Sequence, residues 1–128
     1  MFKNGITEEQ IIAGMRDDFL KDAAKRLALL RQNLAKARSG AADCDALAGF
    51  RAEVHTLKGT GQSFGFPSLT MISRRFEGYL RGHDAEAFAA DAALDSFLEA
   101  IASVIDAGQE PDEDALDALL DGLAAAKD

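Results

Sequence analysis

Apolar residues recur at intervals of three and four positions along most of this 128-residue chain. Because an α-helix turns by about 100° per residue, that interval gathers apolar side chains on one helical face. Before Ser39-Gly40, the face consists of Ile12, Met15, Phe19, Ala23, Leu27, Leu30 and Leu34. After it, a second face consists of Leu47, Phe50, Val54, Leu57, Gly61 and Phe64. With only two prolines to interrupt it, this pattern predicts an all-α protein.

Capping and breaking residues divide the pattern into four long helices and one short one. The expected long helices span about residues 8–39, 43–64, 67–81 and 84–107, with Thr7 and Gln10 as a capping box, Asp43 and Asp84 as caps and Pro67 in a first turn. Their short connections predict an antiparallel up-down four-helix bundle, with its core at about residues 8–107 of a single domain, 1–128. The acidic segment that follows predicts a further short helix at about 111–126, packed on the bundle.

Composition excludes several classes of function. The net charge of −8 argues against a nucleic-acid partner. No apolar run reaches the roughly 18 residues that span a bilayer, and the N-terminus lacks a signal-peptide pattern, so we expect no membrane contact and a cytoplasmic location. The sequence contains no glycine-rich loop that ends in Lys-Ser/Thr, so we do not expect it to bind a nucleotide. Two histidines and one cysteine give no metal site, and His83, in a Gly-His-Asp turn, is expected to be solvated and inert.

A polar stripe on the second helix carries the chemistry of the chain. His55, Lys58, Gly59 and Gln62 follow one another at helical spacing and so share one face, beside the apolar face. Histidine titrates near neutral pH, so its uncharged ring nitrogen can attack phosphorus there. A lysine one turn away can neutralise phosphoryl oxygens. The stripe therefore predicts a phosphoryl-accepting site, although a lone helical histidine more often has no chemical role.

Two glycines in this helix need a reason to be there. Each costs about 1 kcal/mol relative to alanine in a helix interior. We expect Gly59 to let the backbone of a docking protein approach His55, and Gly61 to let a neighbouring helix approach.

Charge is distributed unevenly along the chain. Residues 51–81 contain five basic and two acidic residues, a net charge of +3, whereas residues 82–128 contain thirteen acidic residues and one lysine, a net charge of −12. The basic segment, which includes Arg51, either steers an acidic partner to the site or reflects chance clustering on a solvated surface. If the segment steers a partner, we expect Arg51 to contact that partner.

The run from His55 to Gly59, followed by Phe64-Gly65-Phe66-Pro67, Leu69 and Phe76-Glu77, resembles the histidine phosphotransfer (HPt) domains of bacterial two-component phosphorelays. The resemblance covers about residues 8–107, with the specific motif at 53–77. It implies that His55 is phosphorylated, that Lys58 binds the phosphoryl group, and that Gly59 and Gln62 contact the partner. It also implies a monomeric phosphoryl carrier rather than an enzyme. The carrier would take the group from a receiver-domain phospho-aspartate or a sensor or hybrid histidine kinase, and give it to a response regulator. No cofactor is expected, since the receiver supplies the Mg²⁺.

Two other functions stay open. One is a helical docking adaptor for receiver or kinase domains that is never phosphorylated, although docking alone needs neither His55 nor Lys58. The other is a dimerising fragment of a sensor histidine kinase. In such helices an acidic residue typically follows the histidine directly and a proline comes soon after, whereas this chain has Thr56 and Gly59.

Overall fold

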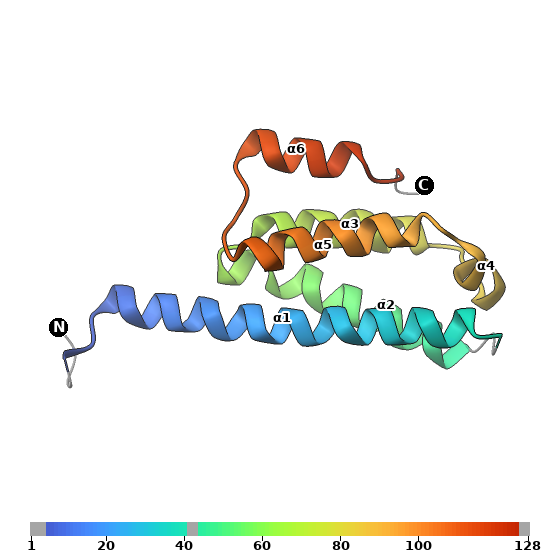
Figure 1. Cartoon of the computed structure of the whole chain (residues 1–128), viewed down its shortest axis with the longest axis horizontal. Coiled ribbons are helices and arrows are strands. Elements are labelled where there is room, and N and C mark those ends of the chain that lie inside the picture. Colours follow the sequence, from blue (N-terminus) through green and yellow to red (C-terminus); the bar gives the residue numbers. More distant parts are fainter. Residues whose placement is uncertain (1–4, 41–43, 126–128) are drawn as a thin grey trace.

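The structure is a computed structural model that describes residues 5–40 and 44–125 (Figure 1). Its helices are α1 (Glu8–Arg38), α2 (Cys44–Thr60), the 3₁₀ helix η2 (Gln62–Phe64), α3 (Pro67–Leu80), α4 (Ala85–Ala90), α5 (Leu94–Ala107) and α6 (Glu113–Asp121). No strand occurs among these described residues, so the predicted all-α class is confirmed. Within the same ranges, no helix combines the length and the apolar character needed to cross a membrane.

Helix α1 begins as the sequence predicts but extends beyond the rest of the fold. The Thr7 hydroxyl accepts from the Gln10 amide at 3.1 Å, and the Gln10 side chain accepts from the Thr7 amide at 2.8 Å, which completes the capping box. Every residue from 5 to 18 is exposed, and burial starts at Phe19. The N-terminal part of α1 accordingly projects past the other helices (Figure 1).

The core lies between α1, α2, α3, α4 and α5. Helix α1 contacts α2, α4 and α5, and α3 contacts α2 and α5. Phe76 of α3 lies at the centre, with its ring stacked on Phe97 at 4.3 Å and edge-on to Phe50 at 5.3 Å. Phe50 in turn meets Phe88 at 4.8 Å, and all four rings are fully buried. These aromatic contacts join α2, α3, α4 and α5 into one core.

The second helix ends four residues earlier than predicted. Helix α2 stops at Thr60, and the chain turns through η2 instead of continuing to Phe64. The Gly61 carbonyl accepts from the amides of Phe64 at 3.2 Å and Phe66 at 2.9 Å, so the α-helical hydrogen-bond pattern stops there. Gly65 then takes a positive φ of 89°, which suits glycine. The predicted cap Asp43 lies outside the described residues.

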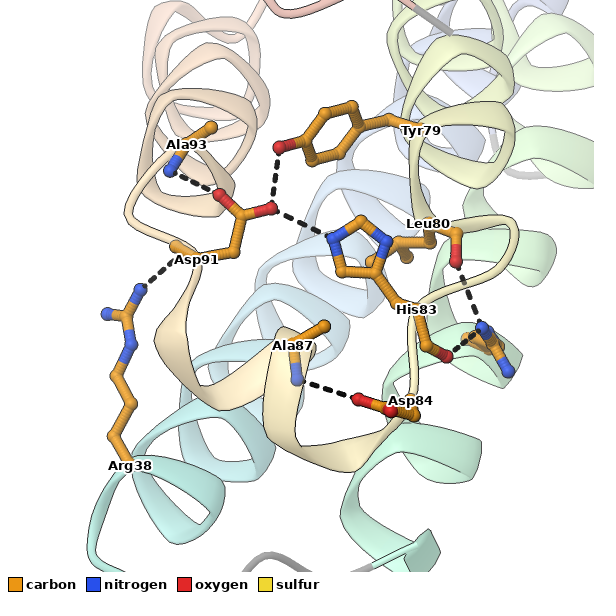
Figure 2. A network of polar contacts seen from close by, with 9 residues as sticks. Arg38, Tyr79, Leu80, His83, Asp84, Ala87, Asp91 and Ala93 are labelled. Atoms are coloured by element: carbon orange, nitrogen blue, oxygen red, sulfur yellow. Dashed lines mark hydrogen bonds and ion pairs between the residues drawn. The ribbon is translucent and has the colours of Figure 1, made fainter. Parts of the chain in front are cut away.

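The prediction of one helix from 84 to 107 is wrong, because the helix is interrupted at Asp91, between α4 and α5. The Asp91 carboxylate accepts hydrogen bonds from the Tyr79 hydroxyl at 2.5 Å, from His83 Nε2 at 2.8 Å and from the Ala93 amide at 2.9 Å (Figure 2). Burial raises the pKa of Asp91, but these hydrogen bonds lower it by more, so its pKa lies below the ordinary value. Asp91 thus links α3 to the α4–α5 connection.

The expectation that His83 is solvated is also wrong. Its side chain is only 3% exposed, and Nε2 donates to the Asp91 carboxylate. The turn at Gly82, where φ is 84°, directs the imidazole back to the Tyr79 ring, 5.2 Å away between centroids. His83 therefore stabilises the fold rather than facing solvent.

The Asp91 network makes stability sensitive to alkaline pH. The hydrogen bond to Asp91 and burial raise the pKa of Tyr79 from 10.0 to about 12. Because the folded state holds this proton more tightly than the unfolded state does, the Tyr79 contribution is complete below pH 10.0 and is lost toward about pH 12. We expect the difference in free energy of unfolding between the wild type and Tyr79→Phe to shrink over this interval. Urea unfolding at several pH values measures it, and a constant difference would contradict the assignment.

Helix α6 forms within the predicted range. It packs against the core through its half-buried Leu119 and Leu120, together with Leu123 just after its end. Two polar links attach the C-terminal segment to α3. Arg75 donates to the Leu120 carbonyl at 2.7 Å, and the Ser68 amide donates to the Glu110 carboxylate at 3.0 Å. Glu110 thereby caps the N-terminus of α3, where no local side chain does so.

Candidate functional site

One carboxylate on α3 holds two of the predicted site residues of α2. Nδ1 of His55 lies 2.9 Å from Oε2 of Glu77, and the Lys58 ammonium donates to Oε1 at 2.6 Å. The His55 side chain is 71% exposed, whereas Glu77 and Lys58 are 34% and 27% exposed. The imidazole is therefore anchored at one nitrogen and open to solvent around the rest of the ring.

Helix packing holds this cluster in place. Val54 and Leu57, adjacent to His55 and Lys58 in sequence, are fully buried and fix the rotation of α2 about its axis. The Thr70 hydroxyl of α3 donates to the Lys58 carbonyl at 2.9 Å and accepts from the Gln62 amide at the same distance. These bonds tie the end of α2 to the first turns of α3, so Glu77 lies beside His55.

The contact with Glu77 decides which ring nitrogen is available. Burial raises the pKa of the Glu77 carboxyl, but the hydrogen bonds from Lys58 and His55 lower it by more, so its pKa lies below the ordinary value. An ionised carboxylate only accepts hydrogen bonds, so Nδ1 of His55 carries the proton. The lone pair of the neutral ring is then on Nε2, at the solvent end.

Sequence reasoning did not give Glu77 a role. It appeared only as part of the motif Phe76-Glu77, because a partner 22 residues from His55 is found only when α2 and α3 are paired in space. The charge of Glu77 is the sequence signal that could have pointed to it, since Glu53 and Glu77 are the two acidic residues in the basic segment 51–81. Glu53 instead accepts from Arg26 of α1 at 2.9 Å.

The other predicted site residues are placed differently from one another. Gly59 is exposed, and a Cβ there would meet no atom within 4 Å. Gln62 is exposed and uses its backbone amide to bind Thr70. Arg51 donates to the carbonyls of Leu80 and His83, both at 2.9 Å, so it supports the end of α3. Contact of these three residues with a partner stays a prediction.

The prediction that Gly61 admits a neighbouring helix is confirmed. A Cβ on Gly61 would lie 2.9 Å from the Phe66 carbonyl oxygen and 3.0 Å from both the Leu69 Cβ and the Thr70 amide nitrogen. These are mostly backbone atoms and cannot move aside cheaply.

Alanine substitution separates the two glycines. We expect Gly61→Ala to lower the free energy of unfolding by about 1–3 kcal/mol through steric conflict. Gly59→Ala, in open space within the last turn of α2, should raise it by about 0.5–1 kcal/mol because alanine favours helix. Urea unfolding of both variants measures the difference, and equal effects would mean that the close approach at Gly61 does not govern stability.

Among residues 5–40 and 44–125, no three His, Cys, Asp or Glu side chains are grouped as metal ligands would be. The Glu77 carboxylate, which lies beside His55, is engaged at both oxygens by His55 and Lys58. The cluster thus offers a nucleophilic nitrogen and a nearby ammonium, and the expectation that it needs no cofactor of its own stays a prediction.

Comparison with known proteins gives one match. The family model described as the Hpt domain matches residues 14–128, which include every helix from α2 to α6 and most of α1. No curated protein and no solved structure gives a significant match to the chain.

Proposed function

Since this chain belongs to the Hpt domain family, whose members are phosphocarrier modules of two-component phosphorelays, we propose that it carries a phosphoryl group on Nε2 of His55. The observation that carries this proposal is the 2.9 Å hydrogen bond between Nδ1 and Glu77, on a side chain that is 71% exposed. It presents the Nε2 lone pair to a protein that docks from solvent.

Transfer would be an in-line displacement at phosphorus. The new bond joins Nε2 of His55 to phosphorus, and the bond from phosphorus to the aspartate oxygen of a receiver domain breaks, which releases a carboxylate. The Nδ1 proton stays on the ring, so the phosphorylated imidazole is positively charged. The Glu77 carboxylate lies 2.9 Å from Nδ1 and would stabilise this charge as it develops.

Lys58 would act on the phosphoryl oxygens only after a movement. Its ammonium donates to Glu77 at 2.6 Å, on the Nδ1 side of the ring. We propose that the Lys58 ammonium moves from Glu77 to the phosphoryl group when the dianionic oxygens arrive. The move is possible because the ammonium lies at the end of a flexible side chain. The positive charge that forms on the ring in the same step would then balance the Glu77 carboxylate in place of the Lys58 ammonium.

The donor and acceptor would be receiver domains, with a sensor or hybrid histidine kinase as a further donor. Members of the Hpt domain family interact with response regulators and kinases in phosphorelays. Exposed Gly59, one turn after His55, would admit the receiver backbone, and the receiver would hold the Mg²⁺ that neutralises the phosphoryl oxygens.

We also propose a monomer, with α1, α2, α3 and α5 as the antiparallel up-down bundle. Light scattering tests the monomer, and an obligate dimer would favour a kinase fragment.

Phosphorylated receiver domains from the same organism test the function. We expect intact mass after incubation to rise by one phosphoryl group, and peptide mapping to place an acid-labile group on His55. Complexes that form with a receiver without any transfer would overturn the carrier proposal and favour the docking adaptor.

Glu77→Gln tests the proposed stabilisation of the ring. Glutamine can still accept from Nδ1, but it lacks the charge that balances the imidazolium. A neutral hydrogen bond in place of a charged one should raise the free energy of the transition state by about 1–1.5 kcal/mol and slow transfer to His55 by about five- to tenfold. Single-turnover transfer from a phosphorylated receiver measures the rate. Glu53→Gln makes the same change at the other acidic residue of segment 51–81. It serves as the control and should leave the rate of transfer unchanged.

A further inference from the structure

An open groove runs between α5 and α6. It consists of two adjoining cavities of about 750 and 370 Å³, and Ser103, Ala118 and Leu119 line both of them. The residues that line these cavities all lie between Asp95 and Leu123, so helix α2 and Glu77 take no part. The groove is a surface separate from the His55 cluster.

The attachment of α6 leaves the groove open. The links from Arg75 to the Leu120 carbonyl and from Ser68 to Glu110 both join the C-terminal segment to α3. The walls toward the groove are made largely of small residues, namely Ala100, Ser103 and Ala107 of α5, Ala115 and Ala118 of α6, and Gly122 just after α6. Short side chains on both walls let a third backbone come close to α5 and α6.

The chemistry of the groove is apolar at its base and acidic at its rim. Half-buried Leu119 provides apolar surface at the larger cavity, which buried Val104 also lines. The acidic lining residues are Glu110 and Asp112 at the larger cavity and Asp95 and Glu99 at the smaller one. No lysine or arginine lines either cavity in the part of the chain that the structure describes.

The rim acids differ in how far they are already paired. Asp95 accepts from Arg38 of α1 at 2.9 Å, whereas Glu99 is 77% exposed and lies 3.8 Å from Arg31. Asp112 is exposed and accepts only from a backbone amide, that of Ala115, among the bonds found. The negative charge of Glu99 and Asp112 is therefore accessible to a ligand.

We propose that this groove binds an amphipathic helix of a partner protein, with small and aliphatic residues on one face and lysine or arginine at its edges. A helix laid between two helices buries its apolar face against them, and basic residues at its edges would meet the acidic rim. A second copy of this chain is a poor occupant. The exposed apolar residues of its projecting α1, such as Ile12 and Met15, are accompanied by Glu8, Glu9, Asp17 and Asp18.

A model helix tests the groove directly. The probe is a peptide of about five helical turns made of leucine and lysine, with leucine on one face, and the control is a scrambled peptide of equal composition. We expect chemical-shift changes in the ¹⁵N-labelled full chain to concentrate at residues 95–123. By titration calorimetry, the scrambled peptide should bind at least about tenfold more weakly.

Substitutions on each wall complete the test. Ala118→Arg and Ser103→Arg fill the groove from opposite helices and add positive charge, so each should weaken binding by at least about tenfold. Ala24→Arg makes the same change at an exposed position of α1 and should bind like the wild type. Circular dichroism identifies a variant that fails to fold.

Other results would overturn the proposal. Equal binding of both peptides, or insensitivity to both groove variants, would mean attraction by charge alone. Chemical-shift changes at residues 8–18 instead would place the peptide on α1. Concentration-dependent dimers that Ala118→Arg dissolves would make a second copy the occupant.

Discussion

Glutamine at position 55 is expected to abolish phosphorylation of this chain by every phosphorylated receiver that labels the wild type. Glutamine has no nucleophilic lone pair on nitrogen, because its amide nitrogen is conjugated to the carbonyl. The side chain of His55 is 71% exposed, so the change should alter the free energy of unfolding by no more than about 0.5 kcal/mol. Intact mass reports the phosphoryl group, and urea unfolding followed by circular dichroism reports the fold.

The chain provides its own control in its second histidine. His83 is buried and donates to Asp91, so His83→Gln should lower stability and keep labelling. Labelling retained in His55→Gln, or lost in a folded His83→Gln, would contradict the assignment of His55.

Alanine at position 76 is expected to give the largest loss of stability. Phe76 is fully buried, stacks on Phe97 and meets Phe50 edge-on, so truncation leaves a cavity where α2, α3 and α5 join. Removal of a buried phenylalanine typically costs about 3–5 kcal/mol. Urea unfolding at neutral pH measures this cost. Because Glu77 follows Phe76 directly, the variant should also lose transfer activity as the cluster becomes less ordered.

Met71→Ala is the matched control on the same helix, since Met71 is 41% exposed and its loss should cost less than about 1 kcal/mol. If Phe76→Ala were no more destabilising than Met71→Ala, the aromatic contacts would not be the centre of the core.

Helix faces were predictable because burial imposes the helical period on the sequence. In α1, the predicted residues Phe19, Leu27, Leu30 and Leu34 are all buried. The same pattern continues through Ile12 and Met15, which are each 52% exposed, because within residues 5–40 and 44–125 no other helix covers that end. Periodicity shows which side of a helix is apolar, but not how far its neighbours extend.

The helix breaks depend on contacts distant in sequence. The alanine-rich stretch around Asp91 favours helix by propensity, yet Asp91 bonds Tyr79 and His83 of another segment and the helix stops. Likewise, helical spacing placed His55 and Lys58 on one face, whereas their shared partner Glu77 required the pairing of α2 with α3. Spacing along one helix predicts neighbours within it, and partners across helices follow only from the fold.

The high exposure of the His55 ring bears on the energetics of a relay. A phosphoryl group attached at its solvent end would be largely hydrated, with Lys58 and the Glu77 bond to the ring as its contacts within this chain. With so few contacts from this chain to give up, the group would stay accessible to any receiver that docks there. The direction of flow would then depend on the relative concentrations and affinities of the receivers, and the same domain could load or discharge either of them.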